Sequence, residues 1–86
     1  MIKNVPSYFT QNDLIYVINQ QFYGRYDYFY MPVDINSKFN MGFAFINMVS
    51  PIYILDFYLD FNCCQWKNKV ENCNSQKYCE IVYANM

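Results

Sequence analysis

This sequence lacks histidine altogether and has little glycine or proline. Its 86 residues include no histidine, two glycines and three prolines. The chain therefore lacks the side chain used most often as a general base near neutral pH and as a metal ligand. The two glycines, Gly24 and Gly42, stand too far apart to form a glycine-rich phosphate loop. We find no set of catalytic residues, and we expect a binding domain rather than an enzyme.

An excess of basic charge is missing too. The chain has six basic and seven acidic residues, for a net charge of −1. Domains that hold nucleic acids mainly through phosphate contacts are strongly basic. Any nucleic-acid binding here must therefore depend on stacking more than on charge.

The four cysteines do not have the spacing of a metal site. Cys63 and Cys64 are adjacent, and Cys73 and Cys79 follow after nine and six residues. A zinc site would favour paired Cys-x-x-Cys motifs. No secretory signal opens the sequence, so we expect reduced thiols in an intracellular protein, with no metal and no cofactor. A disulfide framework is the alternative, and the spacing does not support it.

A long uninterrupted hydrophobic run is also missing. The most apolar segment, residues 41–61, contains five residues that break a bilayer span: Asn47, Ser50, Pro51, Asp56 and Asp60. We interpret this segment as a strand followed by a helix and expect no membrane partner.

Aromatic residues, by contrast, are abundant. They make up 22% of the chain, and hydrophobic residues make up 55%. A domain of this size buries only roughly 60–65% of the surface that its unfolded chain exposes. Some rings must therefore lie at the surface, where they are available for binding.

The apolar pattern predicts two helices and four strands. A helix is expected from Thr10, which forms a capping box with Asp13, to residue 23, before Gly24. A second helix is expected at 51–61, because Ser50-Pro51 is a strong helix start. The expected strands are 1–6, 25–31 (ending at Pro32), 41–48 and 77–84. The loop 62–76 is expected to contain at most a short irregular strand near Trp66, whose ring we expect to be packed.

These elements follow the order β-α-β-β-α-β, which predicts an α+β, ferredoxin-like fold. Two right-handed βαβ crossovers place both helices on one face of a four-stranded antiparallel sheet and leave the other face open. No linker or repeat divides the chain. We expect residues 1–86 to be one domain, excised from a longer protein.

Side chains on adjacent strand positions point to opposite faces of the sheet. Small or aliphatic residues of strand 41–48 should face the helices: Gly42, Ala44 and Ile46. Its larger residues should face the open side: Phe43, Phe45 and Asn47. In strand 25–31 we expect Tyr26, Tyr28 and Tyr30 on one face, and Asp27, Phe29 and Met31 on the other. Two exposed phenylalanines at a sheet centre suit base stacking.

Several segments resemble a known family. "MGFAFINM", residues 41–48, resembles the octamer signature of the RNA recognition motif, K/R-G-F/Y-G/A-F-V-x-F/Y. "MIKNVP" resembles the companion hexamer on the first strand. "YDYFYMPVD", "NMGFAFIN", the Ser-Pro before the second helix and "CEIVYA" are similar to the carboxy-terminal RNA recognition motif of the Mei-two-like meiosis regulators. The resemblance covers essentially the whole chain.

The resemblance implies that the open sheet face binds single-stranded RNA in a nuclear or cytoplasmic protein. Phe43 and Phe45 would stack on a base or sugar, and Met1 falls where many relatives have a third ring. Lys3 and Lys38 would approach phosphates. The remaining candidates would extend the binding surface: Tyr28, Tyr30, Asn47, Glu80 and Val82.

Two positions depart from the family pattern. Met41 stands where arginine or lysine holds a phosphate, and Met1 replaces an aromatic ring. Losing one ring and one charge costs roughly 2–4 kcal/mol, which is one to three decades in affinity. The same apolar, nearly neutral face would also suit a protein partner or self-association, and this remains the alternative.

Overall fold

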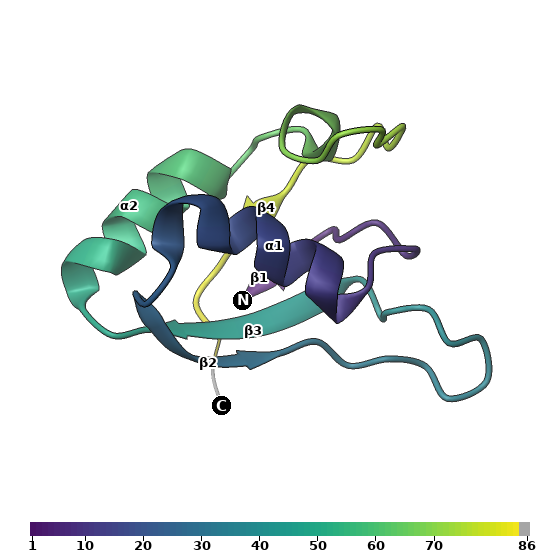
Figure 1. Cartoon of the computed structure of the whole chain (residues 1–86), viewed down its shortest axis with the longest axis horizontal. Helices are drawn as coiled ribbons and strands as arrows, with labels where there is room; N and C mark the ends of the chain where they lie inside the picture. The colour runs from purple at the N-terminus through teal and green to yellow at the C-terminus, as the bar shows by residue number, and fades with distance from the viewer. Residues whose placement is uncertain (85–86) are drawn as a thin grey trace.

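The expected order of elements is confirmed. A computed structural model describes residues 1–84 and contains two helices on one face of a four-stranded antiparallel sheet (Figure 1). The strand order is β2-β3-β1-β4. The helices are α1 (Gln11–Phe22) and α2 (Pro51–Phe61), and the strands are β1 (Ile2–Lys3), β2 (Tyr26–Tyr30), β3 (Phe43–Met48) and β4 (Glu80–Ile81).

The helix boundaries follow local signals in the sequence. Thr10 Oγ1 accepts a hydrogen bond from the Asp13 amide at 3.1 Å, and Asp13 Oδ2 accepts one from the Thr10 amide at 2.9 Å. The expected capping box is therefore present. α2 begins at Pro51 as predicted, although the Ser50 side chain makes no capping hydrogen bond.

The outer strands are shorter than predicted. β1 ends at Lys3 because Asn4 adopts a left-handed backbone conformation, with φ of 63°. β4 covers only Glu80–Ile81 of the expected 77–84. The segment near Trp66 is a 3₁₀ helix, Trp66–Asn68, so the expected irregular strand is reduced to one bridge between Gln65 and Tyr78.

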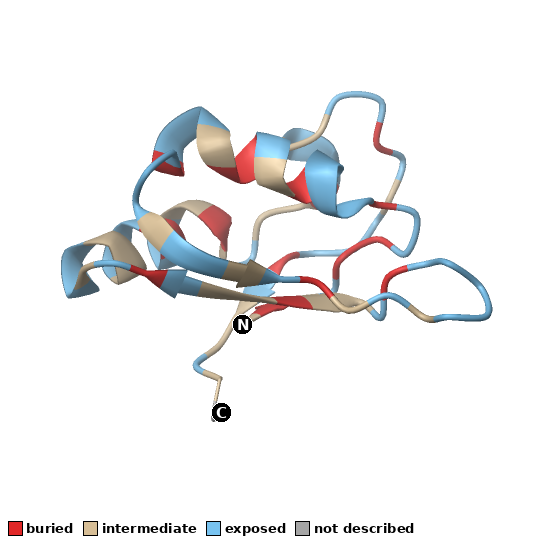
Figure 2. Ribbon diagram, turned by 60° about the horizontal axis from the view of Figure 1, so that its bottom comes forward, coloured by how far each residue is buried: buried red, intermediate tan, exposed pale blue. Residues whose placement is uncertain are grey.

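The core lies between the helices and the sheet, where buried residues line the facing surfaces (Figure 2). Aromatic rings occupy its centre: the Phe22 and Phe57 ring centroids are 5.2 Å apart, and those of Phe57 and Phe61 are 4.6 Å apart. Trp66 is fully buried and meets Phe9 edge to face at 5.6 Å. Burying a large apolar side chain stabilises the fold by roughly 1.5–3 kcal/mol, so each of these rings contributes substantially to the stability.

The first residues of β2 contradict the predicted face assignment. Tyr28 pairs with Asn47, but Tyr26 pairs with Met48, so Asp27 is an extra residue in a β-bulge. Tyr26 therefore packs against the core, and its hydroxyl donates to Asn19 Oδ1 on α1 at 2.6 Å. The prediction that Tyr26 shares a face with Tyr28 and Tyr30 was wrong.

The bulge also moves Asp27. We predicted that this side chain would share a face with Phe29 and Met31. Instead it is exposed, and its Oδ1 accepts a hydrogen bond from Asn47 Nδ2 at 2.8 Å. Phe29 and Met31 do pack in the core as expected. An inserted residue reverses the alternation of side chains on one side of a bulge, which explains why only Tyr26 and Asp27 are misplaced.

Candidate nucleic-acid interface

The side chains of β3 alternate between the core and the open face. Ala44 and Met48 are buried, and Ile46 packs against the core. Phe43 and Phe45 lie on the opposite face, which the helices do not cover (Figure 1). Their ring centroids are 5.5 Å apart, with an interplanar angle of 79°. The sheet thus presents a pair of partly buried, edge-to-face rings, as the sequence predicted.

β2 places two tyrosines beside this pair. Tyr30 lies opposite Phe45, and Tyr28 lies opposite Asn47. Tyr28 and Tyr30 are 46% and 50% exposed, so much of each ring is open to solvent. Cross-strand neighbours on one face are close enough for their side chains to touch. We call Phe43, Phe45, Tyr28 and Tyr30 the aromatic platform.

β1 and β4 place a charged pair at the side of the platform. Lys3 lies opposite Phe43 on one side and Glu80 on the other. Lys3 Nζ is 3.6 Å from a Glu80 carboxylate oxygen, and both side chains are nearly half exposed. Such a surface pair stabilises the fold little. Its effect is local: Glu80 offsets the positive charge of Lys3 beside the rings.

Met1 and Val82 continue the pairing of β1 with β4. The Met1 amino group donates to the Val82 carbonyl at 2.6 Å, and the Val82 amide donates to the Met1 carbonyl at 3.0 Å. Burial lowers the pKa of the Met1 amino group from its ordinary value. Both residues are partly buried, as Phe43 and Phe45 are.

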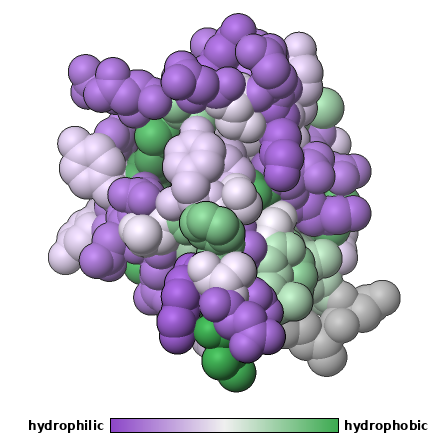
Figure 3. Space-filling model, turned by 90° about the vertical axis from the view of Figure 1, so that its right-hand side faces the viewer, coloured by the Kyte–Doolittle hydropathy of each residue, from purple (hydrophilic) through white to green (hydrophobic). Residues whose placement is uncertain are grey.

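Lys38 is the candidate that lies apart from the strands. It belongs to the loop between β2 and β3, which projects beyond the sheet (Figure 1). The loop is internally bonded: the Lys38 amide donates to the Asp34 carbonyl at 2.9 Å. The Ser37 amide donates to Asp34 Oδ2 and lowers the pKa of that carboxyl. Viewed from the side to which this loop points, hydrophilic residues form most of the surface (Figure 3).

Asn40 supports the platform, and it was not among the predicted residues. Its buried side-chain amide nitrogen donates to the carbonyls of Pro6 at 2.8 Å and Phe9 at 2.9 Å. Its Oδ1 accepts from the Gly42 amide at 2.7 Å. Asn40 therefore ties the β1–α1 loop to the start of β3. An asparagine shortly before a predicted strand was the available signal, but many asparagines occupy such positions for turn formation alone.

Within residues 1–84, no group of histidine, cysteine or acidic side chains could hold a metal ion. The four cysteines, all in that range, are free thiols. Burial raises the pKa of the Cys79 thiol to about 12, so it stays protonated. Among the helices of the same residues, none is long and apolar enough to cross a bilayer.

Comparison with known proteins agrees with this geometry. Residues 1–86 match the family described as RNA recognition motif 2. Over 84 residues the chain is 44% identical to Protein MEI2-like 2 of Oryza sativa subsp. japonica, covering 98% of this chain and 9% of that protein. Over the same length it is 42% identical to Protein MEI2-like 3 of Arabidopsis thaliana, covering 98% and 10%.

A third relative extends the agreement. Protein MEI2-like 1 of Arabidopsis thaliana is 39% identical over 84 residues, which cover 98% of this chain and 9% of that protein. The chain thus spans about a tenth of the length of the curated relatives that it matches. The match over its whole length confirms the resemblance to the Mei-two-like proteins and a binding module rather than an enzyme. The chain belongs to the RNA recognition motif 2 family, an RNA-binding family.

Proposed function

We propose that this domain binds single-stranded RNA on its open sheet face and holds the bases by stacking them on the aromatic platform. The observation that carries the proposal is the pair Phe43 and Phe45, placed on a face that the helices leave bare. Every base has a flat aromatic surface, so such stacking tolerates sequence and contributes about 1–3 kcal/mol per base. Duplex RNA does not offer its base faces, which favours a single strand.

The charges around the platform imply modest affinity. Lys3 is the cation beside the rings, and Glu80 already lies 3.6 Å from it. Met41, where the family signature has a basic residue, is 57% exposed and supplies no charge. Each phosphate contact on a single strand contributes a salt-dependence slope of about −0.7. We therefore expect RNA affinity to vary weakly with salt, because few phosphates are neutralised.

A titration of the double variant Phe43→Ala/Phe45→Ala tests the proposal. Fluorescence anisotropy with a pool of short, labelled single-stranded RNAs should show about five- to 150-fold weaker binding, as the loss of one stacked base predicts. Phe39→Ala is the matched control, because Phe39 is 52% exposed in the β2–β3 loop, outside the strands. Equal affinities for the parent and the double variant, both folded by circular dichroism, would contradict the proposal.

Self-association over the same face is the alternative outcome. The platform is apolar and carries little net charge, as a protein-binding surface would. Light scattering over a range of protein concentrations distinguishes the two. A dimer that RNA does not dissociate, and that the double alanine variant abolishes, would assign the face to protein contact instead.

We also propose that the chain is one domain of a longer intracellular protein. The length of the curated relatives supports the first part, because the chain covers about a tenth of them. The four free thiols support the second, because reduced cysteines suit a nuclear or cytoplasmic compartment. Fractionation of cells that express the longer protein would test the location.

A further inference from the structure

The bulge in β2 places the Asp27 carboxylate on the open face, next to the aromatic platform. β-bulges often re-aim a side chain beside a functional site. Here the extra residue directs the Asp27 side chain to Asn47 of β3, whose Nδ2 donates to Asp27 Oδ1 at 2.8 Å. Tyr28 of the platform lies opposite Asn47 in the strand pairing. An amide–carboxylate pair therefore stands beside the rings on which we propose that bases stack.

The polar groups of this pair are available to a ligand. Both side chains are exposed, so water or a ligand can reach them. Within residues 1–84, no lysine or arginine forms an ion pair with Asp27. A carboxylate has about four acceptor sites and an amide nitrogen has two donors. The bond between Asp27 and Asn47 uses one of each, which leaves both carboxylate oxygens and one N–H of Asn47 Nδ2 free to bind.

We propose that Asp27, held in place by Asn47, selects guanine among the bases that reach the platform. The inference rests on the proposed RNA binding and adds a base preference to it. The Watson–Crick edge of guanine presents one acceptor, O6, and then two adjacent donors, N1–H and the N2 amino group. Asn47 Nδ2 and the two Asp27 oxygens present one donor and then two acceptors, which is the complementary order. The carboxylate accepts from N1–H and N2–H, and the Asn47 amide donates to O6.

The other three bases fit this edge less well. Adenine and cytosine each present one amino donor beside a ring acceptor, and uracil presents N3–H between two carbonyl oxygens. Each would bring an acceptor toward a carboxylate oxygen, which cannot donate when ionised, and such repulsion is a source of specificity. Phe45 and Asn47 stand two residues apart on one face of β3, about 7 Å along the strand. A base stacked on Phe45 or Tyr28 can therefore direct its edge to the pair, because a single strand leaves base edges free.

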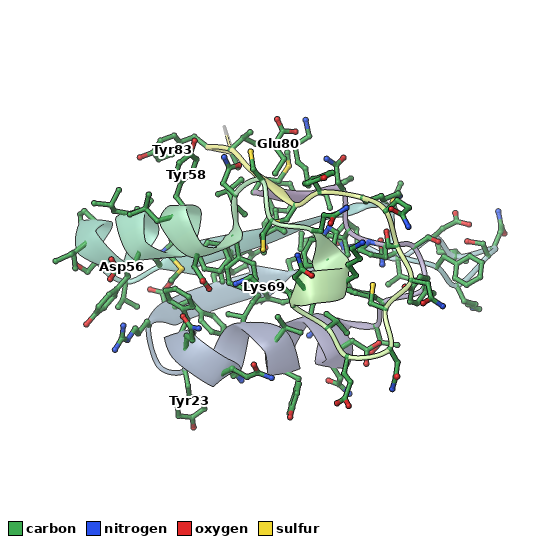
Figure 4. The ribbon with its side chains drawn as sticks, turned by 90° about the horizontal axis from the view of Figure 1, so that it is seen from above. Tyr23, Asp56, Tyr58, Lys69, Glu80 and Tyr83 are labelled. Carbon is green, nitrogen blue, oxygen red and sulfur yellow. The ribbon has the colours of Figure 1, made fainter. Side chains whose placement is uncertain are left out.

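Anisotropy titrations of the 86-residue chain with short RNAs of known sequence test the proposal. The probes are a labelled all-uridine strand and the same strand with one central guanosine, adenosine or inosine. Inosine keeps O6 and N1–H but lacks the N2 amino group. Binding is measured for the parent and for Asp27→Asn, which replaces one acceptor oxygen by a donor. Asp56→Asn is the matched control, because it makes the same charge change at an exposed residue that projects from α2 (Figure 4). Circular dichroism checks that both variants fold.

We expect the parent to bind the guanosine strand about five- to 150-fold more tightly than the adenosine strand, as one bidentate contact to a base predicts. Inosine should lose much of this preference, because one of the two donors is missing. The preference should disappear in Asp27→Asn and remain in Asp56→Asn. Binding without a guanosine preference, or a preference that Asp27→Asn retains, would overturn the role of Asp27 alone. Failure of every strand to bind the parent would overturn the proposed function as well.

Discussion

Replacing Asn40 by alanine should weaken the fold far more than its position in a loop would suggest. The Asn40 side chain makes four hydrogen bonds. Its amide nitrogen donates to the Pro6, Phe9 and Ser7 carbonyls, the last at 3.2 Å, and its oxygen accepts from the Gly42 amide. The Ser7 carbonyl also keeps the Asn40 backbone amide as a donor. The Pro6 carbonyl keeps a second donor, the Phe9 amide at 3.0 Å. The variant therefore leaves mainly the Phe9 carbonyl and the Gly42 amide without this partner.

The magnitude follows from these contacts. A typical hydrogen bond contributes about 1 kcal/mol net, and a buried group left without a partner costs about 1–3 kcal/mol. We expect Asn40→Ala to lower the free energy of unfolding by about 2–4 kcal/mol. This is a large share of the roughly 5–15 kcal/mol typical of a small domain. Each kcal/mol shifts Tm by about 4–8 °C at this size, so the melting temperature should fall by at least about 8 °C.

Urea denaturation followed by circular dichroism measures the change. Asn36→Ala is the matched control, because Asn36 is an exposed asparagine of the same loop. Asn40→Asp is a second test: it keeps the shape but presents an acceptor oxygen to carbonyl oxygens, so it should destabilise at least as much. A loss below about 0.5 kcal/mol for Asn40→Ala, within the usual range of surface substitutions, would refute the structural role given to Asn40.

Three further substitutions give distinct outcomes. Glu80→Gln frees Lys3 and should tighten RNA binding a few-fold and steepen its salt dependence; unchanged affinity in an anisotropy titration would contradict the role of the pair. The neutral Cys79 thiol stabilises the fold fully below its ordinary pKa of 9.0, and this contribution is lost as pH rises towards 12. Cys79→Ala should therefore make the free energy of unfolding fall less steeply above pH 9. In the parent protein, the exposed Cys63 should react with thiol reagents well before Cys79. Equal reaction rates of the two thiols would argue against burial of Cys79. Gly42→Ala should cost about 1–2 kcal/mol by urea denaturation, because φ is +90° although the space for a methyl group is free; a neutral result would show that the backbone relaxes there.

Strong local signals predicted most of the fold. The capping box at Thr10 and the Ser50-Pro51 start located both helices to within one or two residues. The alternation of small and aromatic residues in β3 predicted the open face correctly. A strand pairing shifted by one residue would have placed the phenylalanines under the helices instead.

Long-range features explain the parts that were not predicted. The bulge at Asp27 depends on how β2 and β3 pair, and nothing in the letters of β2 alone marks an inserted residue. The role of Asn40 depends on carbonyls more than thirty residues earlier in the chain. The local sequence of a single segment does not specify such long-range pairings.

An NMR titration of the labelled domain with a pool of short single-stranded RNAs tests the central claim most directly. RNA binding on the sheet predicts chemical-shift changes centred on five residues that line the open face: Lys3, Phe43, Phe45, Tyr28 and Tyr30. Changes confined instead to the outer side of α2, where Ile52, Leu55 and Leu59 are 63%, 56% and 70% exposed, would contradict the assignment of RNA binding to the sheet.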